Sequence, residues 1–116
     1  MFGMSKKASA ESLGKLVQQK KWDKIKKNYL NADEETKVNL AEACALVVSD
    51  DSSNVLIALL DSPEESVKMA ALKSLEKIGN DHCVTTIQQL AETVSPSQTA
   101  LKEQISKTLA ALRGKQ

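Results

Sequence analysis

The amino-acid sequence predicts an all-α protein, built as a right-handed α-α superhelix of antiparallel helix pairs with about seven helices. Helix-start motifs recur at Asn31, Ser62 and Ser95. The motif thus returns after roughly 30 residues, and a repeat of this length is typical of α-solenoids. Apolar residues recur every three or four positions after each start. Gly and Pro together number only six, which is too few for a β-sandwich with many tight turns.

The chain has 116 residues, the length of one domain. We expect residues 1–8 to be disordered and residues 9–113 to form a single repeat domain of three helix pairs plus an N-terminal helix. The N-terminal part predicts helices over residues 9–19 and 22–30, with a break near Lys20 and Lys21. One continuous helix remains an alternative, because no Gly or Pro separates the two segments.

Three longer helices are expected to follow, and each pairs with a shorter apolar segment that precedes it. The expected pairs are 22–30 with 34–48, 53–60 with 63–78, and 82–94 with 96–112. Connections of three to five residues make the paired helices antiparallel. The apolar run Val55–Leu60 also fits a buried strand by composition, but the chain offers no second strand to pair with it.

Each long helix is expected to begin with a capping motif. In the segment from Ser62 to Glu65, Ser62 is the predicted N-cap and Pro63 the first helical residue, while Glu65 reaches back to the cap. The segment 95–98 repeats this arrangement with Gln in place of Glu, and Asn31 is the expected cap of the first long helix.

The stretch from Ala58 to Gly79 reads ALLDSPEESVKMAALKSLEKIG and resembles the HEAT repeat, in particular its bilin-lyase-type HEAT-like form. The matching residues are Leu60, Asp61, Val67, Lys68, Ala71, Leu75, Ile78 and Gly79. The resemblance extends over residues 22–112, although the flanking repeats keep fewer of these positions. The first repeat keeps Lys37, Leu40, Cys44 and Val47, and the third keeps Leu101, Lys102, Ile105, Leu109 and Leu112. Lys68 stands where the family often has Arg, which weakens the family's Asp–Arg ladder.

What the resemblance implies is a stack of armadillo-like helix pairs that binds proteins, often on the concave face lined by the second helices. An enzymatic branch of the family attaches tetrapyrroles, but nothing outside the repeat points to that branch. A lyase-like activity is therefore the least favoured of the alternatives.

Charge is unevenly distributed along the chain, with a net +6 over residues 1–30, −8 over 31–65 and +3 over 66–116. Five lysines surround Trp22, and they predict an alternative anion-binding or nucleic-acid-binding site. These lysines are Lys20, Lys21, Lys24, Lys26 and Lys27. The competing interpretation turns Trp22, Ile25 and Tyr29 inward and leaves the lysines in solvent. The single Arg in the chain and the acidic repeat that follows the lysines argue against a nucleic-acid partner.

No catalytic or metal-binding pattern is present in the sequence. His82 is the single histidine, and it lies next to Cys83 without a second ligand pair at zinc spacing. Cys44 and Cys83 are expected to be small packing residues rather than reactive thiols. The adjacent acids at the expected helix starts are explained by the helix dipole. We therefore expect a protein that is not an enzyme and that uses no cofactor or metal.

The outward side of the long helices, on the concave face of the expected stack, is the expected partner-binding face. With Val67 facing the core, a rotation of about 100° per residue turns Met69, Lys73 and Glu76 outward. The equivalent outward positions are Val38, Glu42 and Ala45 in the preceding long helix and Glu103, Ser106 and Lys107 in the following one. The predicted binding residues are Glu42, Met69, Lys73, Glu76, Glu103 and Lys107. The alternative is that these side chains pack on a neighbour or serve solubility alone.

These features together predict a cytoplasmic scaffold that binds another protein and is a monomer or a weak dimer. No secretory signal is visible, and the longest apolar runs, Ala43–Val48 and Val55–Leu60, are far too short to span a membrane.

Overall fold

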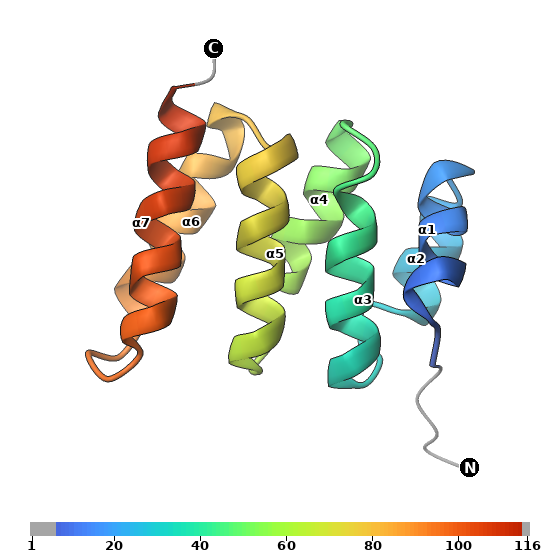
Figure 1. Cartoon of the computed structure of the whole chain (residues 1–116), viewed down its shortest axis with the longest axis horizontal. Helices are drawn as coiled ribbons and strands as arrows, with labels where there is room; N and C mark the ends of the chain where they lie inside the picture. Colours follow the sequence, from blue (N-terminus) through green and yellow to red (C-terminus); the bar gives the residue numbers. More distant parts are fainter. Residues whose placement is uncertain (1–6, 115–116) are drawn as a thin grey trace.

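The computed structural model describes residues 7–114, which form two layers of helices and contain no strand (Figure 1). The first layer consists of α1 (Ala10–Gln18), α3 (Glu34–Cys44), α5 (Glu65–Ile78) and α7 (Thr99–Arg113). The second layer consists of α2 (Trp22–Asn28), α4 (Asp50–Leu59), the short 3₁₀ turn η1 (Asp81–Cys83) and α6 (Val84–Thr93). The all-α fold of about seven helices is therefore confirmed.

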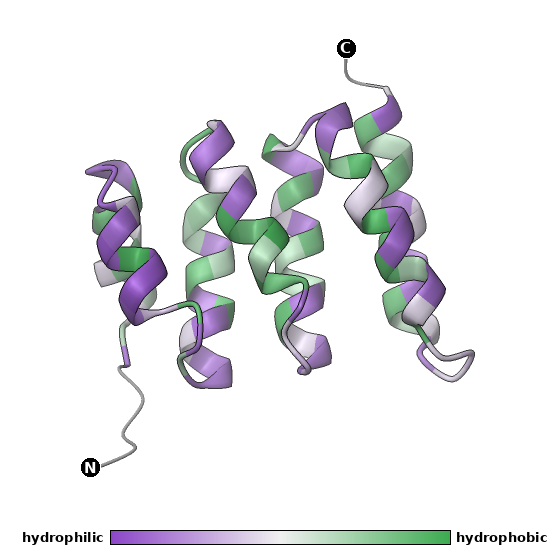
Figure 2. Cartoon of the chain, turned by 180° about the vertical axis from the view of Figure 1, so that it is seen from behind, coloured by the Kyte–Doolittle hydropathy of each residue, from purple (hydrophilic) through white to green (hydrophobic). Residues whose placement is uncertain are grey.

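The first layer is a row in which α1, α3, α5 and α7 lie side by side in chain order (Figure 1). Viewed from behind, α4 lies in the middle of the second layer and carries the most hydrophobic segment of that layer (Figure 2). It packs against both α3 and α5, while α6 packs against α7. Each apolar helix face is thus covered only because the next helix pair lies beside it.

The first repeat differs from the expected pairing of 22–30 with 34–48. The main neighbours of α3 are α1, α5 and α4, whereas α2 packs chiefly against α1. The N-terminal helix α1 is therefore the first member of the long-helix row, and it covers the side of α3 that would otherwise face water.

The break near Lys20 is confirmed, and the structure shows how α1 ends there without a Gly or Pro. Lys20 has a φ of 60°, in the left-handed region. Its N–H donates to the Val17 carbonyl and the next N–H, of Lys21, donates to the Leu16 carbonyl, each across 3.0 Å. These two bonds form a Schellman motif, which usually has Gly where Lys20 stands.

The predicted end of the helix 34–48 is wrong, because α3 ends at Cys44. Bonds from the Ala45 and Leu46 N–H groups reach only three positions back, to the carbonyls of Glu42 and Ala43, and they close the helix there. The Val48 side chain is consequently 77% exposed, and that of Leu46 is 57% exposed. The next helix, α4, begins at residue 50 rather than 53.

The start of α4 is capped by a serine hydroxyl. The Oγ of Ser49 accepts from the Ser52 N–H across 3.1 Å. This hydrogen bond accounts for the earlier start of α4, because it satisfies one of the N–H groups that a helix start leaves unpaired.

The predicted capping motifs of the long helices are also wrong in part. Asp33 and Glu64 occupy the N-cap positions of α3 and α5, and neither side chain makes a capping hydrogen bond. Ser62 lies outside α5 and is buried. At α7 the Oε1 atom of Gln98 accepts from the Ser95 N–H across 3.1 Å, as expected of a capping box, but the helix begins later, at Thr99.

The core is aliphatic, and side-chain hydroxyls add polar links between the long helices. Ser74 Oγ, on α5, donates to the Ala41 carbonyl of α3 across 2.7 Å. One repeat later, Thr108 Oγ1 donates to the Leu72 carbonyl across 3.2 Å and accepts from Gln104 across 3.0 Å. When the repeats are aligned, Thr108 stands at the position of Ser74, and Leu72 at that of Ala41. Polar contacts between repeats therefore repeat along with the apolar ones.

The predicted disorder of residues 1–8 falls mostly on residues 1–6, which lie outside the described residues. Ala8 is described, and it exchanges two hydrogen bonds with α3. Its N–H donates to Thr36 Oγ1 across 3.4 Å, and its carbonyl accepts from Asn39 Nδ2 across 3.3 Å. The segment that leads into α1 is thus attached to α3.

Candidate protein-binding face

The outward residues of α3, α5 and α7 form one surface, which we call the long-helix face. Its members are Val38, Glu42, Met69, Lys73, Glu76, Glu103 and Lys107. Glu42, Lys73, Glu103 and Lys107 are exposed, whereas Met69 and Glu76 are half-buried. The structure therefore brings the six predicted binding residues to neighbouring helices of one layer.

The apolar part of this face consists of Val38 and Met69, which occupy equivalent positions in consecutive repeats. Both side chains are half-buried at the edge of the core. Because α3 and α5 pack against each other, these two positions lie on adjacent helices of the same surface. As the apolar side chains of this face, they are the ones whose burial by a partner would stabilise a complex most.

An open hollow of about 420 Å³ adjoins this apolar part, between the first turns of α3 and α5. It is lined by Glu34, Glu35, Val38, Asn39 and Ser66. The Ser66 hydroxyl donates a hydrogen bond to the Glu34 carboxylate, and this bond links α5 to α3 at the hollow. None of the lining residues was predicted as a binding residue, although Val38 was expected to face outward. Their place near the starts of equivalent helices is a signal that could have identified them.

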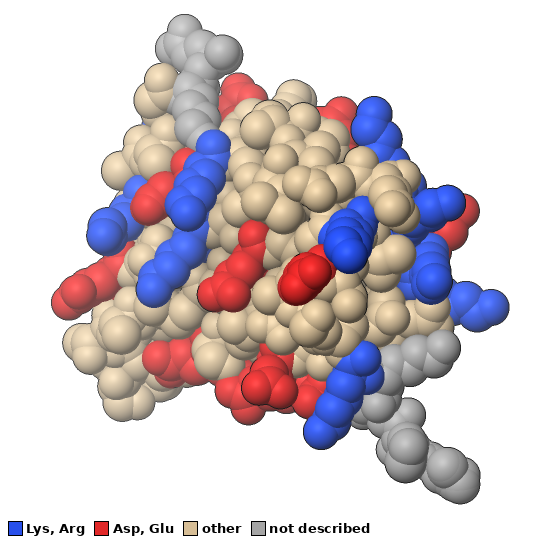
Figure 3. Space-filling model, turned by 45° about the vertical axis from the view of Figure 1, so that its right-hand side comes forward, with Lys and Arg blue, Asp and Glu red and all other residues tan. Residues whose placement is uncertain are grey.

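Acidic side chains gather along the lower edge of the molecule in Figure 3, where α3 and α5 begin. The first-turn acids at that edge include Glu34, Glu35 and Glu65. Their negative charge complements the helix dipoles, and it leaves the long-helix face acidic at one end.

The five lysines of the predicted anion-binding cluster, Lys20, Lys21, Lys24, Lys26 and Lys27, are all exposed. Trp22 is only 8% exposed and Ile25 is fully buried, so both face the core. The indole ring is therefore not available for stacking on a base, as the inward-facing interpretation predicted. The lysines remain a charged surface around α2, and Trp22 does not contribute to that surface.

A buried ion pair joins the first repeat to the second. Lys37, only 7% exposed, extends from α3 and donates to Glu64 Oε1 across 2.8 Å and to Ser62 Oγ across 2.9 Å. The Ser62 hydroxyl in turn donates to the Glu64 carboxylate. The hydrogen bonds from Lys37 and then from Ser62 lower the pKa of Glu64 to about 2. Sequence reasoning missed this cluster because it expected Ser62 to cap α5.

The thiol and imidazole groups show no arrangement for catalysis. Burial raises the pKa of the Cys44 thiol to about 12, so it stays protonated and unreactive. Cys83 is also buried, whereas His82 is exposed. Within residues 7–114, no three His, Cys, Asp or Glu side chains come together as a metal site.

None of the helices in the described part of the chain combines the length and the hydropathy needed to cross a membrane.

The family comparison agrees with the repeated architecture. The family model for HEAT repeats matches residues 24–110, from α2 to the last turns of α7. No curated protein and no solved structure matches the chain. The bilin-lyase-type form of the repeat stays a prediction. HEAT repeats are commonly protein-interaction scaffolds and are generally not enzymes. The chain belongs to the HEAT repeat family.

Proposed function

We propose that this chain is a non-enzymatic scaffold that binds a partner protein on the long-helix face. The observation that carries the proposal is the pair formed by Val38 and Met69, two half-buried apolar side chains on adjacent helices among exposed charges. A small apolar centre with a charged rim is the usual composition of a protein-binding surface. The flexible thioether of Met69 can adapt its shape to a partner.

Charges of both signs surround the apolar pair on the row of long helices. Glu42 on α3 has Lys73 as its equivalent on α5 and Lys107 on α7. A partner with complementary charges would be oriented by this pattern, since rim charges contribute more to orientation and association rate than to affinity. The open hollow beside Val38 offers room for one side chain of the partner.

The test is affinity capture of the tagged full-length chain from its native cells, with Met69→Glu and Lys73→Glu as variants. Met69→Glu places a charge at the apolar centre and should remove the captured protein, and Lys73→Glu should weaken capture in a salt-dependent manner. Ala58→Glu adds the same charge to an exposed position on α4, in the other layer, and should leave capture unchanged. Capture of every partner by Met69→Glu at the wild-type level would remove this face from consideration.

Binding of anions by the lysine cluster is the weaker alternative, because Trp22 is buried and its indole ring is not available for base stacking. It predicts salt-sensitive binding to DNA, RNA or anionic lipid that is lost in a Lys24→Ala, Lys26→Ala, Lys27→Ala triple variant. Absence of such binding at low salt would eliminate it.

A further inference from the structure

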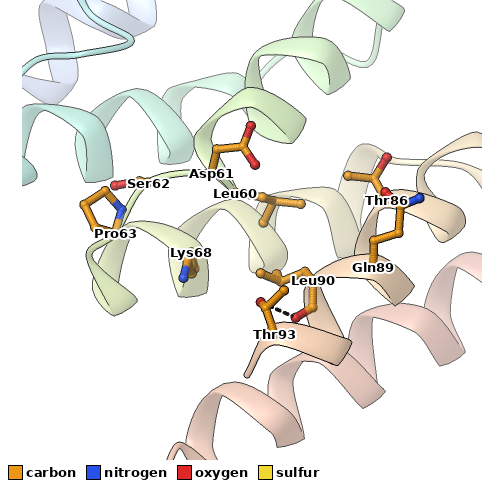
Figure 4. A pocket seen from close by; sticks show the side chains of 9 residues that line it. All are labelled: Leu60, Asp61, Ser62, Pro63, Lys68, Thr86, Gln89, Leu90 and Thr93. Atoms are coloured by element: carbon orange, nitrogen blue, oxygen red, sulfur yellow. Dashed lines mark hydrogen bonds between the residues drawn. The ribbon is translucent and has the colours of Figure 1, made fainter. Parts of the chain in front are cut away.

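A second hollow, of about 300 Å³, lies on the side of the short helices, away from the long-helix face (Figure 4). The turn between α4 and α5 forms one wall, with Leu60 and Pro63, and α6 forms the other, with Leu90 and Thr93. Lys68 projects from the first turns of α5 between them. The volume is at the lower end of the range of ligand sites, so it suits one or two side chains rather than a cofactor.

Lys68 is half-buried in this hollow, and its ammonium group has no hydrogen bond or ion pair with any residue between 7 and 114. Leu60 and Leu90 line the hollow together with Lys68. Because the lysine is only partly exposed to water, a partner for its ammonium group is worth more than at a fully exposed site. The walls offer apolar side chains and the hydroxyl of Thr93, which already donates to the Leu90 carbonyl across 2.8 Å.

The structure contains a filled version of the same arrangement one repeat earlier. In the aligned repeats, Lys68 is the equivalent of Lys37. Lys37 reaches the turn that leads into the next long helix, where it finds the Ser62 hydroxyl and the Glu64 carboxylate. The lysine position is therefore built to meet a carboxylate supplied by the neighbouring repeat.

The third repeat lacks that carboxylate. When the two Ser-Pro turns are aligned, Ser95 is the equivalent of Ser62, and Ser97 stands where Glu64 would be. The two hydroxyl oxygens, Ser95 Oγ and Ser97 Oγ, are 3.0 Å apart, in place of the serine–glutamate contact of the second repeat. Lys68 keeps its position, but the acid that would neutralise it is missing.

We propose that this hollow binds the side-chain carboxylate of a glutamate in an acidic peptide segment of a partner protein. The carboxylate pairs with Lys68, as Glu64 pairs with Lys37, and the methylene groups of the same glutamate side chain pack on the half-buried Leu90. The site combines Lys68 of α5 with the α4–α5 turn and α6, and it contains none of the residues of the long-helix face, so its existence does not depend on binding there.

Among the described residues, Asp61 is the one acid that lines the hollow. Its side chain is exposed, and its carboxylate points away from Lys68 (Figure 4). No ion pair joins the two, so Asp61 does not substitute for the missing acid. Asp61→Asn is expected to tighten peptide binding, because it removes a like charge near the incoming carboxylate.

The test uses the full chain and a blocked synthetic peptide with the sequence of residues 61–65, Asp-Ser-Pro-Glu-Glu, at low salt. Amide shifts in a ¹H–¹⁵N NMR titration should move around Lys68 and along α6, and the same peptide with Gln for both Glu should cause no such movement. Lys68→Gln should weaken binding at least about tenfold, as expected for loss of a charged hydrogen bond. Lys102→Gln, at the equivalent position of the last repeat, should have no effect.

The sharpest variant places the missing acid back into the chain. Ser97→Glu should pair with Lys68 within the molecule and abolish peptide binding, while Ser97→Gln should retain it. Ser97 is exposed and Lys68 is half-buried, so the substitutions at these two positions are not expected to unfold the protein, which circular dichroism checks. Four results would each overturn the proposal: no peptide-induced shifts, binding unaffected by Lys68→Gln or by Ser97→Glu, equal binding of the Gln peptide, or displacement of the peptide by inorganic phosphate at equal concentration.

Discussion

Lys37 on α3 and Glu64 in the turn before α5 form an ion pair of 2.8 Å that joins the first repeat to the second. The lysine is buried, and it also donates to Ser62, so three side chains satisfy one another where two repeats meet. A buried cation of this kind is tolerated only when it is paired and hydrogen-bonded. The ion pair therefore forms only when the turn before α5 is packed against α3.

The Lys37–Glu64 contact predicts a specific dependence of stability on pH. The pKa of Glu64 is about 2 in the folded protein, below its ordinary value of 4.5. A carboxyl group whose folded pKa is lowered stabilises the fold above its unfolded pKa, and the contribution is lost as the pH falls toward the folded pKa. The melting temperature should therefore drop as the pH falls from about 4.5 to about 2.

Glu64→Gln should flatten this part of the pH profile, measured by thermal unfolding from about pH 7 to about pH 2. Glu92→Gln serves as the control, because Glu92 is exposed and forms no ion pair with the described residues. Profiles of equal steepness for the wild type and Glu64→Gln would show that the pair does not govern acid stability.

The hydroxyl links between the long helices predict a ranked loss of stability. Ser74→Ala removes one buried hydrogen bond to the Ala41 carbonyl and should cost about 1 kcal/mol. Thr108→Val removes the bond to Leu72 and also leaves the buried Gln104 amide without its acceptor, so it should cost about 1–3 kcal/mol. Urea unfolding measures both, with the exposed Ser106→Ala as the control. The reverse order would contradict the role assigned to Gln104.

The Schellman motif after α1 predicts a stabilising substitution. Lys20 adopts a φ of 60°, which is strained for a residue with a Cβ atom and free of strain for Gly. Lys20→Gly should therefore raise the free energy of unfolding by about 0.5–1 kcal/mol. Lys24→Gly, at an exposed position inside α2, should lower it by a similar amount. Destabilisation by both changes would show that Lys20 does not hold this geometry in solution.

At Gly79, in contrast to Lys20, we expect a substitution to lower the stability of the fold, because there is no room for a methyl group. A Cβ atom there would lie 2.7 Å from the Leu75 carbonyl oxygen and 3.1 Å from Leu112 Cδ2. The backbone of α5 would have to shift, so Gly79→Ala should destabilise the protein by about 1–3 kcal/mol. Gly114→Ala, whose nearest atoms are 3.6 Å away, should have little effect. Equal unfolding midpoints for the two variants would mean that the end of α5 is not tightly packed against α7.

Much of the fold could be predicted because each repeat carries the same apolar spacing. The stripe of Val67, Ala71 and Leu75 places the core side of α5, and those three residues are buried. The alignment of the repeats also matches equivalent contacts between neighbouring long helices, such as those of Ser74 with Ala41 and of Thr108 with Leu72.

What could not be predicted depends on contacts between distant residues. Ser62 has the local chemistry of an N-cap, but the buried Lys37, far earlier in the chain, takes its oxygen. Val48 has the spacing of a core residue, but α3 ends before it, at Cys44. Lys20 carries no local signal for the left-handed conformation that it adopts. On the binding face, the apolar spacing predicted which residues face outward. The hollows could not be predicted, because each is formed by residues of separate helices whose relative positions the sequence does not give.

Photo-crosslinking from position 69 tests the central claim most directly. A benzophenone amino acid replaces Met69 on the long-helix face or, as the control, Asp51 in the exposed first turn of α4. Irradiation in the native cells, followed by mass spectrometry, should yield a protein adduct from position 69 and none from position 51. An adduct that forms from position 51 alone, or one that contains nucleic acid in place of protein, would contradict the account.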